Sequence, residues 1–187
     1  MSEICIGLKQ LITTIKDKYN ASTDSLNYLE DVVIKSKCKK IEIVDFKYPV
    51  GGMCLHDSLL LNKSIFTEDY VDMLFCLFHE LTHIYQFNKY GAEKMYGLLD
   101  INTDVNKLAK WLKSIELTAD EMGKRQLQKM IRLGLIKTDK VFILGRYKLV
   151  PDYHFLKIVD ENRKILSDPT IRDCEGISDL YRKTVLI

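Results

Sequence analysis

The chain has 187 residues, and 47% of them are hydrophobic, which is enough apolar material for one substantial core. We therefore expect one domain spanning residues 1–187. Its 28 basic and 26 acidic residues leave a formal net charge of +2, so the composition gives no signal for binding nucleic acid.

The sequence also argues against a membrane or a secreted protein. No window holds the roughly 18 uncharged apolar residues of a membrane span, and the N-terminus lacks the apolar stretch of a secretory signal. Five cysteines, an odd number without Cys-x-x-Cys spacing, argue against a disulfide framework and a structural zinc knuckle. We expect a cytoplasmic protein.

The first third of the chain predicts two helices and a small sheet. Apolar residues recur at helical spacing over 3–19, and a shorter helix is expected over 25–35. Residues 40–46 alternate as a strand does. A turn containing proline and glycine follows at 49–52, and 53–62 predicts one or two more strands.

A long helix should follow this sheet. Thr67 is a suitable N-cap, and Glu68 and Asp69 would then place negative charge in the first turn, where the helix dipole favours it. The helix should end at Gly91. Its expected apolar face consists of Val71, Leu74, Phe75, Phe78 and Leu81.

A second long helix is expected over 103–133, with Gly134 as its C-cap. Residues 141–144 could form a strand, and 153–166 has a helical pattern that stops before Pro169. The expected buried positions of the second long helix are Leu112, Ile115, Ala119, Met122 and Leu127.

The most specific signal in the chain is a His-Glu-x-x-His motif at 79–83 within the first long helix. His79 and His83 are four residues apart and share one helix face, so both imidazoles can reach one metal ion, with Glu80 beside it as a general base for water. The alternative is a pair of histidines that only satisfy ordinary hydrogen bonds. The motif predicts a zinc peptidase.

A catalytic zinc site usually has three protein ligands, so a third is needed. The metzincin pattern is absent, because Gln86 and Lys89 occupy the positions where it needs Gly and His. In the second long helix, Glu116 and Asp120 are four residues apart, which suits a metal ligand and a carboxylate that accepts the Nδ1 proton of a ligating histidine, His79 in our expectation. Two exposed acids on a charged helix are the alternative.

Together, the motif at 79–83 and the Glu116-x-x-x-Asp120 pair resemble the gluzincin branch of zinc peptidases, which includes thermolysin. The local Glu-x-x-Ala-Asp form is similar to small bacterial peptidases of the ImmA/IrrE kind. The resemblance covers two helices and implies an α+β, zincin-like fold. In that fold a small, mostly antiparallel sheet packs on the motif helix and the glutamate-bearing helix, and its edge strand binds extended substrate. The chain is much shorter than thermolysin and has no recognisable counterpart of the C-terminal domain of thermolysin. The substrate of thermolysin therefore cannot be assigned to this chain.

These features predict an endopeptidase with one catalytic Zn²⁺ held by His79, His83 and Glu116, and with Glu80 moving the proton between water and the leaving amine. Tyr153 and His154 are candidates for stabilising the oxyanion, although both can equally be packing or surface residues. The expected partners are a protein or peptide substrate and a regulatory protein. Two other functions remain open: a regulatory or binding module with little turnover, and a metal-dependent hydrolase of a non-peptide amide.

Overall fold

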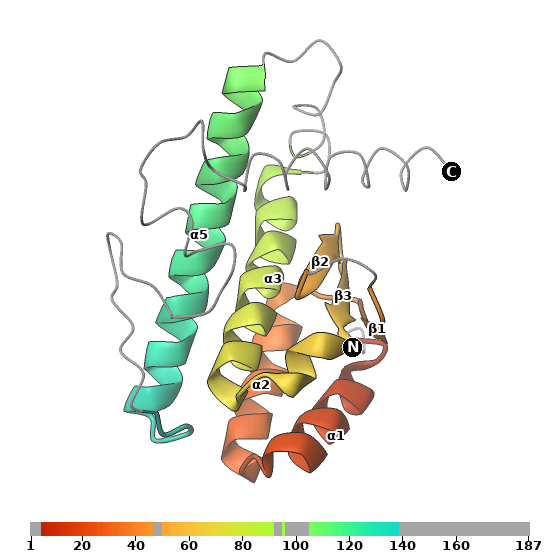
Figure 1. Cartoon of the computed structure of the whole chain (residues 1–187), viewed down its shortest axis with the longest axis vertical. Helices are drawn as coiled ribbons and strands as arrows, with labels where there is room; N and C mark the ends of the chain where they lie inside the picture. The colour runs from red at the N-terminus through yellow and green to blue at the C-terminus, as the bar shows by residue number, and fades with distance from the viewer. Residues whose placement is uncertain (1–4, 47–49, 92–94, 96–104, 139–187) are drawn as a thin grey trace.

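The structure is a computed structural model that describes residues 5–46, 50–91, 95 and 105–138. Within these ranges, helix α3 lies between helix α5 on one side and a three-stranded sheet on the other (Figure 1). Helix α2 packs on α3, and α1 packs on α2 and β1. The elements in chain order are α1 (Leu8–Tyr19), α2 (Thr23–Ser36), β1 (Lys40–Val44), β2 (Gly52–Leu55), β3 (Ser58–Asn62), the 3-10 helix η1 (Lys63–Thr67), α3 (Tyr70–Tyr90) and α5 (Val105–Arg132).

The sheet has the order β1-β3-β2 and is mixed, so the expectation of a mostly antiparallel sheet is wrong. Strand β3 pairs parallel to β1 and antiparallel to β2. Strands β1 and β2 form the two edges of the sheet. After β2, a tight turn at His56 and Asp57 reverses the chain, so β3 runs back between β2 and β1. The central strand is also the most buried, and its Leu59 and Leu61 are completely buried.

Helix α1 starts at Leu8, later than the expected start at residue 3, because Ile6 pairs with strand β1. Ile6 forms a parallel bridge with Lys40. Gly7 then turns the chain with φ 84°, and a Cβ at this position would collide with the carbonyl of Ile41. The helical pattern of the sequence therefore begins before the helix itself, because pairing with β1 holds Ile6 outside the helix.

Helix α3 begins two residues later than predicted, at Tyr70, with Asp69 as its N-cap. The Asp69 carboxylate accepts hydrogen bonds from the backbone N–H groups of Val71 at 2.9 Å and Asp72 at 3.0 Å. Thr67, the predicted cap, instead ends η1 and donates its hydroxyl proton to the Ser64 carbonyl. The helix ends at the predicted Gly91, which has φ 79°.

Helix α3 is buried on most of its sides, and all five positions of its predicted apolar face are confirmed as core. Helix α5 approaches it closely at Gly123, where a Cβ would lie 3.2 Å from Phe75 Cε2 and 3.5 Å from the His79 backbone nitrogen. This close approach at Gly123 brings Asp120 and Glu116, one and two turns earlier on α5, within reach of the histidines on α3.

The packing of α5 follows the sequence pattern in most places. Ile115, Ala119 and Leu127 are buried as predicted, whereas Met122 stays 37% exposed because it lies at the edge of the buried face. Gly134 ends the helix as expected, with φ 70° and its N–H bonded to the Ile131 carbonyl. Three of the predictions concern parts that the structure does not describe: the side chain of Leu112, the strand over 141–144 and the helix over 153–166.

Taken together, the described residues form an α+β arrangement of helices on a small sheet. None of the helices in the described ranges is long and apolar enough to cross a membrane.

Candidate metal centre

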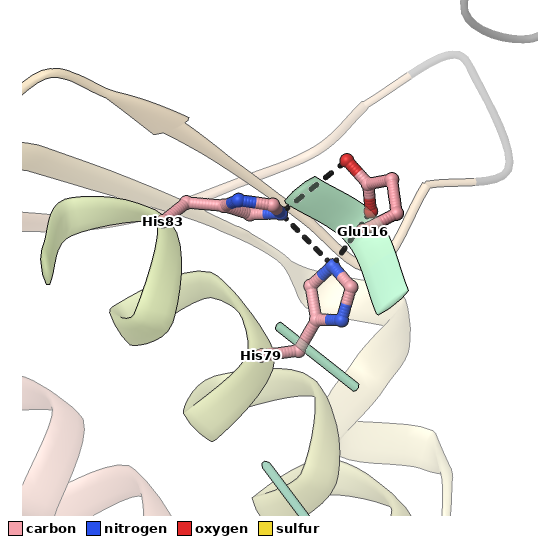
Figure 2. Close-up of side chains that lie close together, drawn as sticks. All are labelled: His79, His83 and Glu116. Atoms are coloured by element: carbon pink, nitrogen blue, oxygen red, sulfur yellow. Dashed lines mark hydrogen bonds and ion pairs between the residues drawn. The ribbon is translucent and has the colours of Figure 1, made fainter. Parts of the chain in front are cut away.

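Two imidazoles project from one face of α3. His79 and His83 are one helical turn apart, and their Nε2 atoms approach each other to 3.0 Å (Figure 2). Both side chains are mostly buried, with 18% and 12% of their surface exposed. The spacing read from the sequence therefore places the two rings together.

Helix α5 adds a carboxylate to this pair. Glu116 Oε2 lies 3.1 Å from His79 Nε2, and Oε1 lies 3.5 Å from His83 Nε2 (Figure 2). The Glu116 side chain is 35% exposed, so one side of the group is open to solvent. Among the described residues, these three form the one group of histidine, cysteine or acidic side chains close enough to hold a metal ion.

The donor spacing fits a tetrahedral metal ion. Ligand atoms at about 2.0–2.1 Å from zinc in a tetrahedron are about 3.3–3.4 Å from one another. The Nε2 atoms of His79 and His83 are 3.0 Å apart, and the nearest Glu116 oxygen lies 3.1 Å from His79 (Oε2) and 3.5 Å from His83 (Oε1), which are values on both sides of that range. The group could therefore hold one ion with little movement of the side chains.

Asp120 supports His79 from one turn further along α5. Its Oδ1 lies 2.9 Å from His79 Nδ1, and the residue is buried. An ionised carboxylate only accepts hydrogen bonds, so His79 carries a proton on Nδ1, and in the neutral form of the ring the lone pair of Nε2 is directed toward Glu116. The structure thus brings together Asp120 and His79, the pair expected from the sequence.

Electrostatics within the group favour positive charge. Burial opposes a charged His79, but hydrogen bonds to Asp120 and Glu116 raise its pKa well above the ordinary value. Burial opposes the charged form of His83 too, and Glu116 raises the pKa of that ring. Burial likewise opposes the Glu116 carboxylate, but the two histidines hold the pKa of Glu116 far below its usual range. These opposite shifts mark a site that attracts a cation.

Glu80 lies beside the histidines on α3 and is buried against strand β2. A Cβ at Gly52 would come within 2.8 Å of Glu80 Cγ, so a side chain on this residue of β2 would displace Glu80. Burial raises the pKa of Glu80, and Glu116 raises it further, although the two histidines act in the opposite direction. A carboxylate with a raised pKa is better suited to accepting a proton near neutral pH.

Gln86 is part of the site but was not predicted as a supporting residue. Its Oε1 lies 2.7 Å from His83 Nδ1, and its Nε2 donates to the Ile115 carbonyl at 2.9 Å. The side chain is 2% exposed. Its position three residues after His83, on the same helix face, is the signal that could have identified it.

Tyr153 and His154, the predicted oxyanion residues, lie outside the described residues. No family model matches the chain, and no curated protein or solved structure matches it either.

Proposed function

We propose that the chain is a zinc-dependent peptidase whose metal is held by His79, His83 and Glu116. The observation that carries the proposal is the convergence of two imidazoles and a carboxylate from two helices. The Nε2 atoms of His79 and His83 are 3.0 Å apart, and each lies near one oxygen of Glu116, at 3.1 Å from His79 and 3.5 Å from His83. Two imidazoles and a carboxylate are a donor set that zinc accepts readily, and three protein ligands leave a fourth position for water or substrate. The partial exposure of Glu116 provides access to that position.

Zinc held by these side chains would supply a Lewis acid next to the scissile carbonyl. Glu80 takes a proton from the attacking water as its oxygen bonds to the carbonyl carbon, and then gives that proton to the amine as the carbon–nitrogen bond breaks. The products are an acid and an amine, and Glu80 is regenerated. The raised pKa of Glu80 supports both proton transfers.

The arrangement around the site supports a peptide as substrate and a zincin-like fold. Strand β2 is an edge of the sheet, runs antiparallel to β3 and packs on α3. Its Gly52 lies directly against Glu80, so an extended peptide added along β2 would pass next to the proposed base. We assign the substrate to proteins or peptides on this basis. We place the activity in the cytoplasm, because the cysteines in the described part of the chain are buried thiols and not disulfides.

The test compares the wild type with Glu80→Gln and His79→Ala, measuring zinc by atomic spectroscopy and hydrolysis of an unfolded protein by mass spectrometry. Glu80→Gln should keep the zinc and lose hydrolysis, by roughly 100-fold or more for a positioned general base. His79→Ala should lose the zinc. Unchanged cleavage by Glu80→Gln would refute the role of Glu80.

Two outcomes would redirect the assignment. Zinc at one equivalent without cleavage of any peptide in a library would favour a binding or regulatory module on the same scaffold. Hydrolysis of simple amides without cleavage of peptides would favour a non-peptide amide hydrolase.

A further inference from the structure

We propose that Gln86 is a positioning residue, which fixes the tautomer of His83 and ties this imidazole to the backbone of α5 beside Glu116. The inference concerns the arrangement of the metal-free site, and its consequence for metal affinity rests on the proposed zinc site.

The contacts of Gln86 link the two ligand-bearing helices. On one side its Oε1 is 2.7 Å from His83 Nδ1, and on the other its Nε2 is 2.9 Å from the carbonyl oxygen of Ile115. Because the side chain is 2% exposed, water cannot easily replace either partner. Ile115 directly precedes Glu116, so the amide reaches the backbone that carries the third donor.

These partners determine the direction of the amide. A backbone carbonyl only accepts hydrogen bonds, so it requires the NH₂ end of Gln86. The oxygen of Gln86 is then the atom that faces His83, and an oxygen acceptor requires a proton on Nδ1. A neutral imidazole carries one ring proton, so His83 Nε2 is left with a free lone pair.

Asp120 fixes the Nδ1–H tautomer of His79 in the same way. Together, Gln86 and Asp120 direct the Nε2 atoms of both histidines toward the centre of the site. Both Nε2 lone pairs face each other at 3.0 Å, and the Glu116 carboxylate lies 3.1 and 3.5 Å away. With both Nδ1 protons committed outward, no ring proton lies between these acceptors. Only an added proton or a cation relieves their repulsion, so Gln86 contributes to a site arranged for a cation before the cation arrives.

The first experiment reads the tautomer in the metal-free protein by ¹⁵N NMR of the histidine rings, at alkaline pH where the imidazoles are neutral. The variants are Gln86→Met, which removes both polar contacts with little change of shape, and Gln86→Glu, which keeps an acceptor for His83. The control is Thr82→Val, which removes the buried hydrogen bond from Thr82 to Phe78 within α3. The Nδ1–H form of His83 should dominate in the wild type, Gln86→Glu and Thr82→Val, and should be mixed with the Nε2–H form in Gln86→Met.

The second experiment measures zinc affinity by competition with a chelator. Gln86→Met should bind zinc about 10–100-fold more weakly than the wild type, as expected for loss of a partner that orients a ligating histidine. Thr82→Val should bind zinc as the wild type does. Thermal unfolding of each variant confirms that a loss of affinity is not a loss of fold.

The inference is overturned if Gln86→Met retains a single Nδ1–H tautomer and wild-type zinc affinity, or if Gln86→Glu loses that tautomer. Failure of the proposed zinc site is recognised separately, because the wild type itself would then take up no zinc. In that case the tautomer measurement still decides the role of Gln86.

Discussion

Glu116 Oε2 on α5 lies 3.1 Å from His79 Nε2 on α3, and Asp120 Oδ1, one turn further along α5, lies 2.9 Å from Nδ1 of the same ring. The imidazole of His79 is therefore held between two carboxylates of one neighbouring helix. Neither helix could form this arrangement alone, and the predictions that follow depend on the packing of α5 against α3.

Removing the Glu116 carboxylate should abolish tight zinc binding. Glu116→Gln replaces a charged donor by a weak neutral one, so zinc should be lost on dialysis against a mild chelator, as measured by atomic spectroscopy. Glu121→Gln is the matched control, because Glu121 lies on the same helix and pairs with Arg125 in a solvent-exposed ion pair. Equal zinc retention by both variants would contradict Glu116 as a ligand.

Removing Asp120 should weaken zinc binding without removing it. Asp120→Ala leaves His79 Nδ1 without its acceptor, so the ring is no longer held with Nε2 toward the metal, and affinity should fall about 10–100-fold in a chelator competition. Asp120→Asn keeps an oxygen acceptor and should lose less than Asp120→Ala. A wild-type affinity for Asp120→Ala would refute this role.

A methyl group on Gly52 should disable the proposed base while sparing the metal. In Gly52→Ala the new Cβ would lie 2.8 Å from Glu80 Cγ and would push the carboxylate aside, so kcat for peptide hydrolysis should fall at least about tenfold with zinc content unchanged. Gly51→Ala is the control, because its Cβ would meet Cys76 Sγ at 2.6 Å instead of Glu80. Equal loss of kcat in both variants would point to displacement of the strand rather than of Glu80.

The stability of the metal-free protein should depend on pH in a direction set by the site. The pKa values of His79 and His83 are raised above the ordinary value of 6.5, so the stability that these residues contribute is complete below pH 6.5 and is lost as the pH rises through their pKa values in the folded protein. The raised pKa of Glu80 acts in the same direction. Glu116 has a lowered pKa, so the stability that it contributes is present above its ordinary value of 4.5 and is lost in strong acid.

We therefore expect the thermal unfolding temperature, measured in a chelator, to fall as pH rises above 6.5. Excess zinc should reduce or reverse this fall, because the ion takes the place of the protons. The Glu116→Gln variant should show a smaller fall, since it lacks the carboxylate that raises both histidine pKa values. A chelator-treated wild type that becomes more stable over this range would contradict the assigned shifts.

The sequence was informative wherever function depends on residues close together in the chain. The four-residue spacing of His79 and His83, and that of Glu116 and Asp120, is converted by the helical repeat into a shared face, which the sequence alone reveals. The core face of α3 and the glycine ends of α3 and α5 were predictable for the same reason. Periodicity and the glycine signals at helix C-termini are local, so local rules recover them.

Only the tertiary structure decided what depends on neighbours in space. The place of β3 between β1 and β2 made the sheet mixed, and the pairing of Ile6 with Lys40 delayed the start of α1. The contact of Gly52 with Glu80, and the hydrogen bond from Gln86 to the Ile115 carbonyl, are likewise contacts between separate elements. Hydrogen-bond partners and steric clearances across elements are set by how the helices and strands pack, and no spacing within a single segment encodes them.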